Sequence, residues 1–365
     1  MRLPRKDSMN LYTPLRAGDL ELANRVVMAP LTRTRSHADG VPSALNVEHY
    51  GQRAGLGLII TEGVFPTAES KAYPGQPGIA TAEQAEGWAR VATAVHDGGG
   101  KIVMQLMHGG RVSHPEITGT PRIVGPSAIA IRGDVRTPVG KLPYPVPHAL
   151  DADELIAVRD AFVAAARRAV DAGLDGVEIH GANGYLLHEF LSPSANRRDD
   201  AYGGSPAARA AFVVDVVSAV AAEVGAGRVG LRLSPAHNIQ DIEEIDPDDV
   251  RATYETVVDG IAPLGLAYLS VLHADPFGGL VQDLRRRFGG VLIANSGFGS
   301  VTSKVEAEEL LDAGAADAVA IGRLAIANPD LVERWKDGHP ENEPNPGTFY
   351  TDGPVGYTDY PRRFA

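Results

Sequence analysis

The chain has 365 residues, a formal net charge of −12, 44% hydrophobic and 22% charged residues, and no cysteine. This composition is that of a globular protein rather than a disordered or fibrous one. The acidic balance, with no basic face or tail, argues against a nucleic-acid partner. Because the chain has no thiol, disulfides, iron–sulfur clusters and cysteine nucleophiles are excluded, and we expect no metal site.

The N-terminus and the hydrophobic runs bear on location and domain organisation. Residues 1–10 are basic but lack the apolar core of a signal peptide, and no run approaches the ~18 apolar residues of a membrane helix. We therefore expect a cytoplasmic protein with no membrane partner, in which residues 1–10 form a flexible extension. The length alone suits two domains, but no linker divides residues 11–365, which are predicted to form one.

From Leu11 onward, short apolar runs alternate with amphipathic segments. A β-hairpin with a Gly-Asp turn is predicted within residues 11–24. The strand candidates that follow are the apolar runs at 25–31, 56–63, 101–108, 176–182, 229–235, 268–274, 291–297 and 318–323. Apolar residues recur at helical spacing in segments at 82–99, 152–173, 207–225, 248–265 and 304–315. Eight apolar strands alternating with helices indicate parallel strands covered by helices, for which a closed (β/α)8 TIM barrel is the economical arrangement.

The longest interruption of this alternation is the segment 109–147, which is rich in glycine, proline and histidine. It follows the third predicted strand of the barrel. Long loops without regular structure are usually functional in compact domains. We therefore expect an extended loop that acts as a lid over the active face.

The centre of the chain places three polar side chains directly after an apolar run: His180, Asn183 and Tyr185. Gly181 and Gly184 lie among them and let the backbone turn where the strand ends, which is where α/β barrels carry their chemistry. His180 and Asn183 can each donate to one oxygen and so polarise a carbonyl or nitro group. Tyr185 is a phenol suited to giving up a proton. A His-x-x-Asn pair on its own is more often a capped loop than a catalytic site.

Arginine and glycine residues at later strand ends indicate an anion site. Arg232 lies inside the apolar run 229–235, where an unpaired charge is costly, so it needs either an anionic ligand or a buried ion pair with a carboxylate. Ser296 and Gly297 end the seventh predicted strand, and Gly322 and Arg323 end the eighth. In barrels of this kind these two loops commonly bind a phosphate.

From Leu11 to the C-terminus the chain resembles the old yellow enzyme family of flavin-dependent ene-reductases, in its bacterial branch. The resemblance is carried by the segments 24–35, 180–205, 229–235, 320–335 and 349–361. It implies a (β/α)8 barrel that binds FMN non-covalently and takes hydride from NADPH or NADH in a ping-pong reaction. The implied acceptors are activated alkenes, namely α,β-unsaturated carbonyls and nitroalkenes, with nitro compounds or nitrate esters as further acceptors.

The resemblance also implies a role for each matching position. Thr32 would hydrogen-bond the flavin carbonyl beside the reactive nitrogen, Gln105 would bind the pyrimidine edge, and Arg232 would face the N1–C2 region. The other implied FMN contacts are Ala29, Pro30 and Gly63 on the ring, and Ser296, Gly297, Gly322 and Arg323 on the phosphate. His180 and Asn183 would hold the oxygen of the substrate, and Tyr185 would protonate the carbon opposite the hydride.

The chain departs from the family pattern near the substrate. Met107 stands where the family usually has tryptophan, so one pocket wall is predicted to be smaller and more flexible. Ala72 and Ser296 replace common glycines, and Ser296 could add a hydroxyl donor for the phosphate. Tyr73 and Tyr350 are expected at the rim of the substrate pocket, with ordinary loop packing as the alternative.

Other flavoprotein barrels fit the sequence less well. Dienoyl-CoA reductases need a cysteine-bound iron–sulfur cluster, and dihydrouridine synthases need a cysteine acid and bind tRNA. A different class of function is a flavin-binding redox protein whose acceptor is a quinone or another electrophile. The complete set of His180, Asn183 and Tyr185 argues against a mere flavin carrier. With no separate dinucleotide fold visible, the nicotinamide should share the pocket of a small electrophilic substrate, in a monomer or homodimer.

Overall fold

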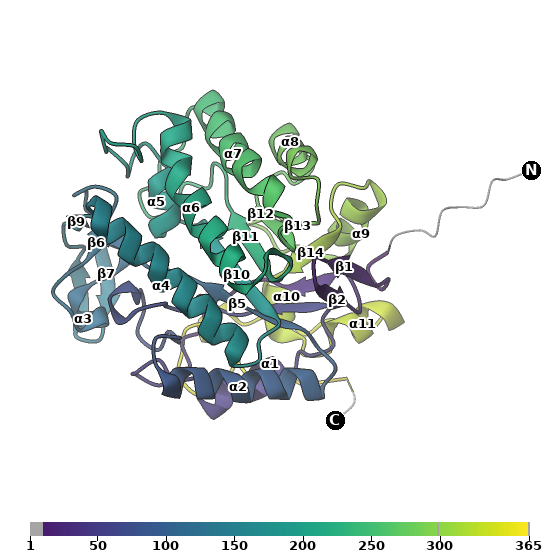
Figure 1. Cartoon of the computed structure of the whole chain (residues 1–365). Coiled ribbons are helices and arrows are strands. Elements are labelled where there is room, and N and C mark those ends of the chain that lie inside the picture. Colours follow the sequence, from purple (N-terminus) through teal and green to yellow (C-terminus); the bar gives the residue numbers. More distant parts are fainter. Residues whose placement is uncertain (1–9, 298, 364–365) are drawn as a thin grey trace, which may run out of the picture.

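Eight parallel strands close into a barrel in the order β10-β11-β12-β13-β14-β3-β4-β5 (Figure 1). The structure is a computed structural model that describes residues 10–297 and 299–363. The barrel strands are β3 (Val26–Met28), β4 (Leu58–Ile60), β5 (Ile102–Leu106), β10 (Gly176–Gly181), β11 (Val229–Leu233), β12 (Tyr268–Leu272), β13 (Leu292–Asn295) and β14 (Ala318–Ile321). Each lies within one of the eight apolar runs, so the prediction of a (β/α)8 barrel is confirmed. The expected extension, residues 1–10, lies outside the described residues apart from Asn10.

Helices surround the barrel. They are α1 (Ala44–Gly51), α2 (Ala82–Asp97), α3 (Pro115–Thr118), α4 (Ala152–Asp171), α5 (Leu186–Leu191), α6 (Pro206–Val224), α7 (Pro247–Ile261), α8 (Gly279–Phe288), α9 (Lys304–Asp312), α10 (Arg323–Ala327) and α11 (Leu331–Asp337). The five predicted helical segments correspond to α2, α4, α6, α7 and α9. Within the described part of the chain, no helix is both long and apolar enough to cross a membrane.

The longer helices begin at residues that satisfy free backbone N–H groups. Asp151 accepts from the N–H of Glu154 at the start of α4, and Ser205 accepts from that of Ala208 at the start of α6. Asp246 does the same for two N–H groups at the start of α7. Since such a cap contributes typically ~1 kcal/mol, these residues fix where each helix leaves the loop that precedes it.

Successive side chains of the strands point alternately into the barrel and toward the helices, so the core has a part inside the barrel and a part outside it. The inner cluster contains Val27, Leu58, Ile60, Val103 and Ile293 and includes residues of the hairpin β1 (Leu15–Ala17) and β2 (Leu20–Leu22). The N–H of Asp19, in the hairpin turn, donates to the carbonyl of Gly227 just before β11. The predicted hairpin therefore closes the amino end of the barrel, which leaves the carboxyl end for the site.

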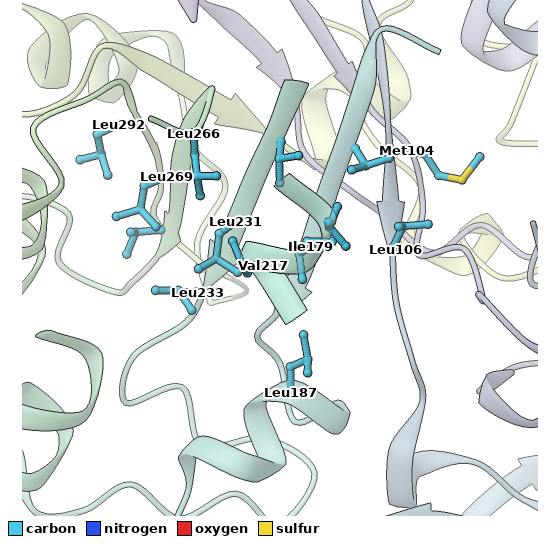
Figure 2. Packing of buried hydrophobic residues seen from close by; sticks show 14 of the residues in the cluster. Met104, Leu106, Ile179, Leu187, Val217, Leu231, Leu233, Leu266, Leu269 and Leu292 are labelled. Atoms are coloured by element: carbon cyan, nitrogen blue, oxygen red, sulfur yellow. The ribbon is translucent and has the colours of Figure 1, made fainter. Parts of the chain in front are cut away.

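The outer cluster joins the strands to the helices. Val217 of α6 lies beside Ile179 of β10 and Leu231 of β11, and these side chains belong to one continuous buried cluster (Figure 2). Neighbouring strand residues such as His180 and Arg232 face the opposite way, because successive side chains on a strand point to opposite faces. The apolar outer face thus fixes the orientation of the polar residues inside the barrel.

The segment between β5 and α4 forms the predicted extended loop. It contains the hairpin of β7 (Asp134–Thr137) and β8 (Gly140–Pro143), and the short parallel pair β6 (Val124–Gly125) and β9 (His148–Ala149). The guanidinium of Arg111 in this segment donates to the carbonyls of Gln240 and Asp241, at 3.2 and 3.0 Å. The loop is therefore bound to the loop after β11 (residues 234–246).

Candidate active site

His180 and Arg232 lie side by side at the carboxyl end of the barrel. His180 on β10 is in register with Arg232 on β11, which is in register with Ser270 on β12. Both His180 and Arg232 are buried. Parallel strands bring their carboxyl ends to one rim, so residues far apart in the sequence meet there.

His180, Asn183 and Tyr185 form a cluster at this rim, which we call the polar trio; His180 and Tyr185 are buried and Asn183 is half-buried. The ring centroids of His180 and Tyr185 are 5.1 Å apart. Asn183 has a φ of 59°, and its N–H donates to the hydroxyl oxygen of Ser234 at 2.9 Å. Within the described residues, Nδ1 of His180 and the side-chain oxygen of Asn183 are buried with no hydrogen-bond partner. The fold thus sets polar atoms at this place without using them for its own hydrogen bonds.

Tyr185 precedes α5 and is paired with a second tyrosine. Its hydroxyl oxygen is 2.7 Å from that of Tyr73, and either group could be the donor. Burial raises the pKa of Tyr185 to about 12, and burial with the neighbouring Tyr185 raises the pKa of Tyr73 well above its ordinary value. Both phenols are therefore protonated at neutral pH, and Tyr185 can act as a proton donor.

The imidazole of His180 is neutral in this setting. Burial lowers its pKa well below the ordinary value, and the positive charge of Arg232 lowers it further. A neutral imidazole still carries one N–H group. His180 can therefore donate a hydrogen bond to a substrate oxygen without bringing a charge into the site.

Arg232 is held by neutral oxygens. Its Nη1 donates to the hydroxyl of Ser270 and its Nη2 to the side-chain oxygen of Asn295, both at 3.2 Å. Glu178, on the neighbouring strand, instead accepts from Nε2 of Gln105 at 2.7 Å. Nε of Arg232 is buried without a partner in the described part of the chain. Because leaving a charged donor unsatisfied is costly, the site fits an electron-rich ligand against Arg232.

A cavity of about 320 Å³ opens at this rim, between the loops after β11, β12 and β13. It is lined by Pro235, Ala236, His237, Leu272, His273, Ala274, Ser296, Gly297, Gly299 and Ser300. The hydroxyl oxygens of Ser296 and Thr302 lie 2.7 Å apart, and Gly297 has a φ of +97°. Gly322 and Arg323 follow the adjacent strand β14, at the start of α10. The predicted phosphate residues thus occupy neighbouring loops at the same rim.

Other predicted flavin contacts follow strands β3 and β4 at the carboxyl end of the barrel. Ala29 is buried, whereas Pro30 and Thr32 are half-buried after β3. Gly63 follows β4, and the sulfur of Met107 would lie 2.5 Å from a Cβ placed on it. The carbonyl of Gly63 accepts from Nε2 of Gln76 at 2.9 Å. A side chain at position 63 therefore cannot be accommodated without moving Met107, which packs directly against the backbone of Gly63.

Met107 and Tyr73 lie beside Tyr185, whereas Tyr350 is exposed. Met107 is 2% exposed and packs in a small cluster with Ala72, Val112, Ile131 and Tyr185, against which Tyr73 and Tyr144 also pack. Tyr350 is 70% exposed, on the C-terminal segment. Arg33 and Arg35 bind the carbonyl of Phe349, which keeps this segment close to the loop after β3.

Several residues of the site escaped the sequence analysis. Gln240 donates from Nε2 to the carbonyl of Asn183 at 3.1 Å, and its own φ is 58°. Glu62 accepts from the N–H groups of Arg33 and Thr34 and so joins the loop after β3 to the end of β4. The others are Gln76, Glu178, Ser234, Ser270 and Asn295. Asn295 directly precedes Ser296, and Ser234 lies two positions after Arg232. Their closeness to these predicted site residues is the signal by which the sequence could have identified them.

Comparisons with known proteins agree with this arrangement. The model of the "NADH:flavin oxidoreductase / NADH oxidase family" matches residues 10–342. The structure of the old yellow enzyme homologue from Zymomonas mobilis superposes with a TM-score of 0.90 at 39% identity, covering 96% of this chain and 99% of that one. This chain belongs to the old yellow enzyme family. It is therefore a flavin oxidoreductase, as the resemblance implied.

Two further members of the old yellow enzyme family indicate the chemistry of its relatives. A "Probable flavin mononucleotide-dependent alkene reductase" of Leishmania infantum is 43% identical over 362 residues, which are 96% of this chain and 97% of that protein. Morphinone reductase in complex with tetrahydroNAD has a TM-score of 0.90 and 42% identity, covering 97% of each chain.

Proposed function

We propose that this member of the family is an FMN-dependent ene-reductase, which takes hydride from NADPH or NADH and reduces the C=C bond of α,β-unsaturated carbonyls and nitroalkenes. The observation that carries the proposal is the polar trio: within the described residues, Nδ1 of His180 and the side-chain oxygen of Asn183 are buried atoms without partners, beside a protonated Tyr185. A protein that only stores electrons needs no such arrangement. Nitro compounds and nitrate esters, which also offer oxygens to the trio, are included among the acceptors.

The residues present fit FMN. The unpartnered Nε of Arg232 suits the N1–C2 region of the ring, where negative charge accumulates on reduction. The other proposed ring contacts are Ala29, Pro30, Thr32, Gly63 and Gln105, and the proposed phosphate contacts are Ser296, Gly297, Gly322 and Arg323. FMN, when bound, supplies a ring that accepts a hydride from the nicotinamide and gives one to the alkene.

The polar trio divides the remaining work between binding and proton transfer. His180 and Asn183 hold the carbonyl or nitro oxygen and stabilise the negative charge that builds up on it as hydride reaches the β-carbon. Tyr185 then donates its proton to the α-carbon, and the product gains one hydride and one proton in all. The hydroxyl of Tyr73, 2.7 Å away, stabilises the phenolate that Tyr185 leaves behind.

The residues that pack around the trio select which substrates can bind. Met107 packs against Tyr185 on one side, and Tyr73 bonds to it on the other, so both restrict how an alkene can lie. Tyr350, which is mostly exposed, contributes at the entrance. The nicotinamide uses the same pocket before the alkene, which requires ping-pong kinetics.

The proposal is tested by releasing and identifying the cofactor and by following the acceptor reaction. Heat-denatured protein should release FMN and neither FAD nor riboflavin. Cyclohexenone should reoxidise the nicotinamide-reduced protein under anaerobic conditions. If reduced protein is reoxidised by a quinone but not by any enone or nitroalkene, the physiological acceptor is of a different class and the ene-reductase assignment is wrong.

The proposal extends to the setting of the enzyme. Residues 11–365 act as one catalytic domain of a monomer or homodimer, since all proposed site residues come from one barrel rim and its C-terminal segment. A cytoplasmic location suits an enzyme that consumes NADPH or NADH. Gel filtration with light scattering tests the oligomeric state, and cell fractionation tests the location.

A further inference from the structure

We propose that His188, Glu244 and Tyr254 act as positioning residues that fix Asn183 and Tyr185 for the alkene reaction, an inference that rests on the proposed function. These three residues, which we call the buried triad, have no part in the mechanism above. Their exposed fractions are 0%, 6% and 0%, respectively. They come from α5, the loop after β11 and α7, and polar groups buried this deeply are retained when their bonds serve the structure or the site.

The first link runs from the backbone of the polar trio to His188. The N–H of Gly184, which lies between Asn183 and Tyr185, donates to Nδ1 of His188 at 2.9 Å. A backbone N–H is always a donor, so Nδ1 must be the acceptor and the hydrogen of the neutral ring must reside on Nε2. That Nε2 lies 3.1 Å from Oε1 of Glu244 and 2.9 Å from the hydroxyl oxygen of Tyr254, so it can donate to either member of the triad. The tautomer of His188 is thus set by its two neighbours.

The second link runs from Glu244 to the loop that covers Asn183. Oε2 of Glu244 accepts from the N–H of Ala236 at 2.8 Å, and the hydroxyl of Tyr254 donates to Oε1 at 3.0 Å. Ala236 has a φ of 57° and lies two residues beyond Ser234, the acceptor for the N–H of Asn183. A non-glycine residue with such a φ persists only where surrounding contacts hold it. Glu244 is therefore bonded directly to the loop after β11 and, through His188, to the backbone next to Asn183.

Close packing makes these two segments depend on one another. A Cβ placed on Gly184, whose φ is +80°, would lie 2.9 Å from the carbonyl oxygen of Ile239 and from Cβ of Gln240. The loop after β11 thus lies directly against Gly184, and we expect a shift of this loop toward Gly184 to displace the adjacent Asn183 and Tyr185. Misplacement of a reacting group by about 1 Å costs roughly a hundredfold in rate, so small displacements here are expected to be visible in catalysis.

The test is Glu244→Gln in the FMN-loaded protein. The carboxylate accepts from His188, Tyr254 and Ala236, whereas a carboxamide of the same shape has one oxygen and must turn its NH2 group toward another donor. Enone reoxidation, measured per bound flavin, should fall about tenfold to a hundredfold. Reoxidation by dioxygen, which uses neither Asn183 nor Tyr185, should keep its rate. Hydrogen exchange of the Gly184 amide should accelerate, since its acceptor is destabilised.

A matched control is Asp249→Asn. Asp249 of α7, the helix that also carries Tyr254, pairs with Arg209 of α6 at 2.6 Å, and in the described structure its side chain forms no hydrogen bond with the trio. The Asp249→Asn variant should have a lower thermal stability but an unchanged ratio between the rates of flavin reoxidation by enone and by dioxygen. Tyr254→Phe removes one donor to Glu244 and keeps the ring. It should also slow reoxidation by the enone, by a smaller factor than Glu244→Gln.

The enone and dioxygen rates and the exchange of the Gly184 amide together decide whether the triad has a positioning role. If the enone and dioxygen rates of Glu244→Gln and Tyr254→Phe stay at wild-type values, or fall together by the same factor, the triad has no positioning role. If Glu244→Gln does not fold, Tyr254→Phe carries the test alone. If the wild-type protein reduces no enone, the proposed function fails, whereas unaltered exchange at Gly184 in both variants overturns the triad without touching that function.

Discussion

The hydroxyl oxygens of Tyr73 and Tyr185 lie 2.7 Å apart, although 112 positions separate the two residues in the chain. Their rings meet edge to face, with an interplanar angle of 89°. One hydroxyl must donate to the other, so the acid proposed for the reaction already has a partner that can stabilise its anion. Tyr185 is therefore the residue whose substitution and titration should affect the alkene reaction most selectively.

Tyr185→Phe should slow flavin reoxidation by cyclohexenone by about 10²–10⁴, the usual contribution of a positioned general acid. Flavin reduction by the nicotinamide needs no proton from Tyr185 and should survive, as should reoxidation by dioxygen. Stopped-flow measurement of the two half-reactions separately is the appropriate assay. Equal losses in both halves would make the phenol structural, and no loss in either would assign the proton to another group or to water.

His180→Ala is the matching variant for the binding role. It removes the donor to the substrate oxygen but leaves the acid in place. Binding and turnover of every carbonyl acceptor should therefore weaken together, in contrast to the selective effect of Tyr185→Phe. A variant that binds carbonyl acceptors normally would show that His180 does not contact their oxygen.

The pH dependence of enone reoxidation should reflect the raised pKa of Tyr185. The protonated phenol is the active form, and burial raises its pKa to about 12, so activity is present below that value and is lost as pH rises through it. A tyrosine with an ordinary pKa of about 10 would be half-ionised at about pH 10. The rate at that pH should instead remain close to its neutral value. A midpoint near the ordinary pKa would contradict the assignment.

Arg232→Ala should weaken FMN binding and lower the reduction potential of the flavin. Loss of a charge-assisted hydrogen bond of about 1.5–3 kcal/mol corresponds to roughly a tenfold to hundredfold rise in the FMN dissociation constant. The potential falls because the anionic reduced ring loses more stabilisation than the oxidised one. Fluorescence titration and a dye-coupled redox titration measure the two effects. An unchanged potential and occupancy would place the guanidinium away from the ring.

Met107→Trp should redistribute the rates among enones of different ring size. Met107 is buried in the same cluster as Tyr185, so a larger rigid side chain changes the space beside the proton donor. Flavin reduction by the nicotinamide should change little. The measurement is a comparison of enone rates across a series of ring sizes, and an equal change for all of them would remove position 107 from the pocket wall.

The sequence was sufficient for the barrel because each buried strand is an apolar run bounded by polar residues. Helix α8 was missed, since its three consecutive arginines, Arg285 to Arg287, obscure the buried stripe of Val281, Leu284 and Phe288. Helices α10 and α11 were missed because they are too short, at five and seven residues, to display a helical period. Local periodicity thus predicts long elements and leaves short or highly charged ones unseen.

The polar trio could be predicted because its three members lie within six residues of one another. Gln240 and Glu62 could not, since their roles come from contacts across the barrel rim with Asn183 and with the backbone of Arg33 and Thr34. The surroundings of Arg232 could also be seen only in three dimensions. Its hydrogen bonds go to the neutral oxygens of Ser270 and Asn295, and the charge of the nearby Glu178 also stabilises it.

The central claim, that the polar trio reduces an activated C=C bond, is tested most directly by a single anaerobic experiment. The purified FMN-loaded protein is bleached with one equivalent of NADPH or NADH and then mixed with cyclohexenone, with product analysis. The account predicts that the flavin absorption returns and that one equivalent of cyclohexanone forms. Reduced protein that stays bleached in the presence of cyclohexenone and nitroalkenes, or a protein that does not bind FMN, would contradict it.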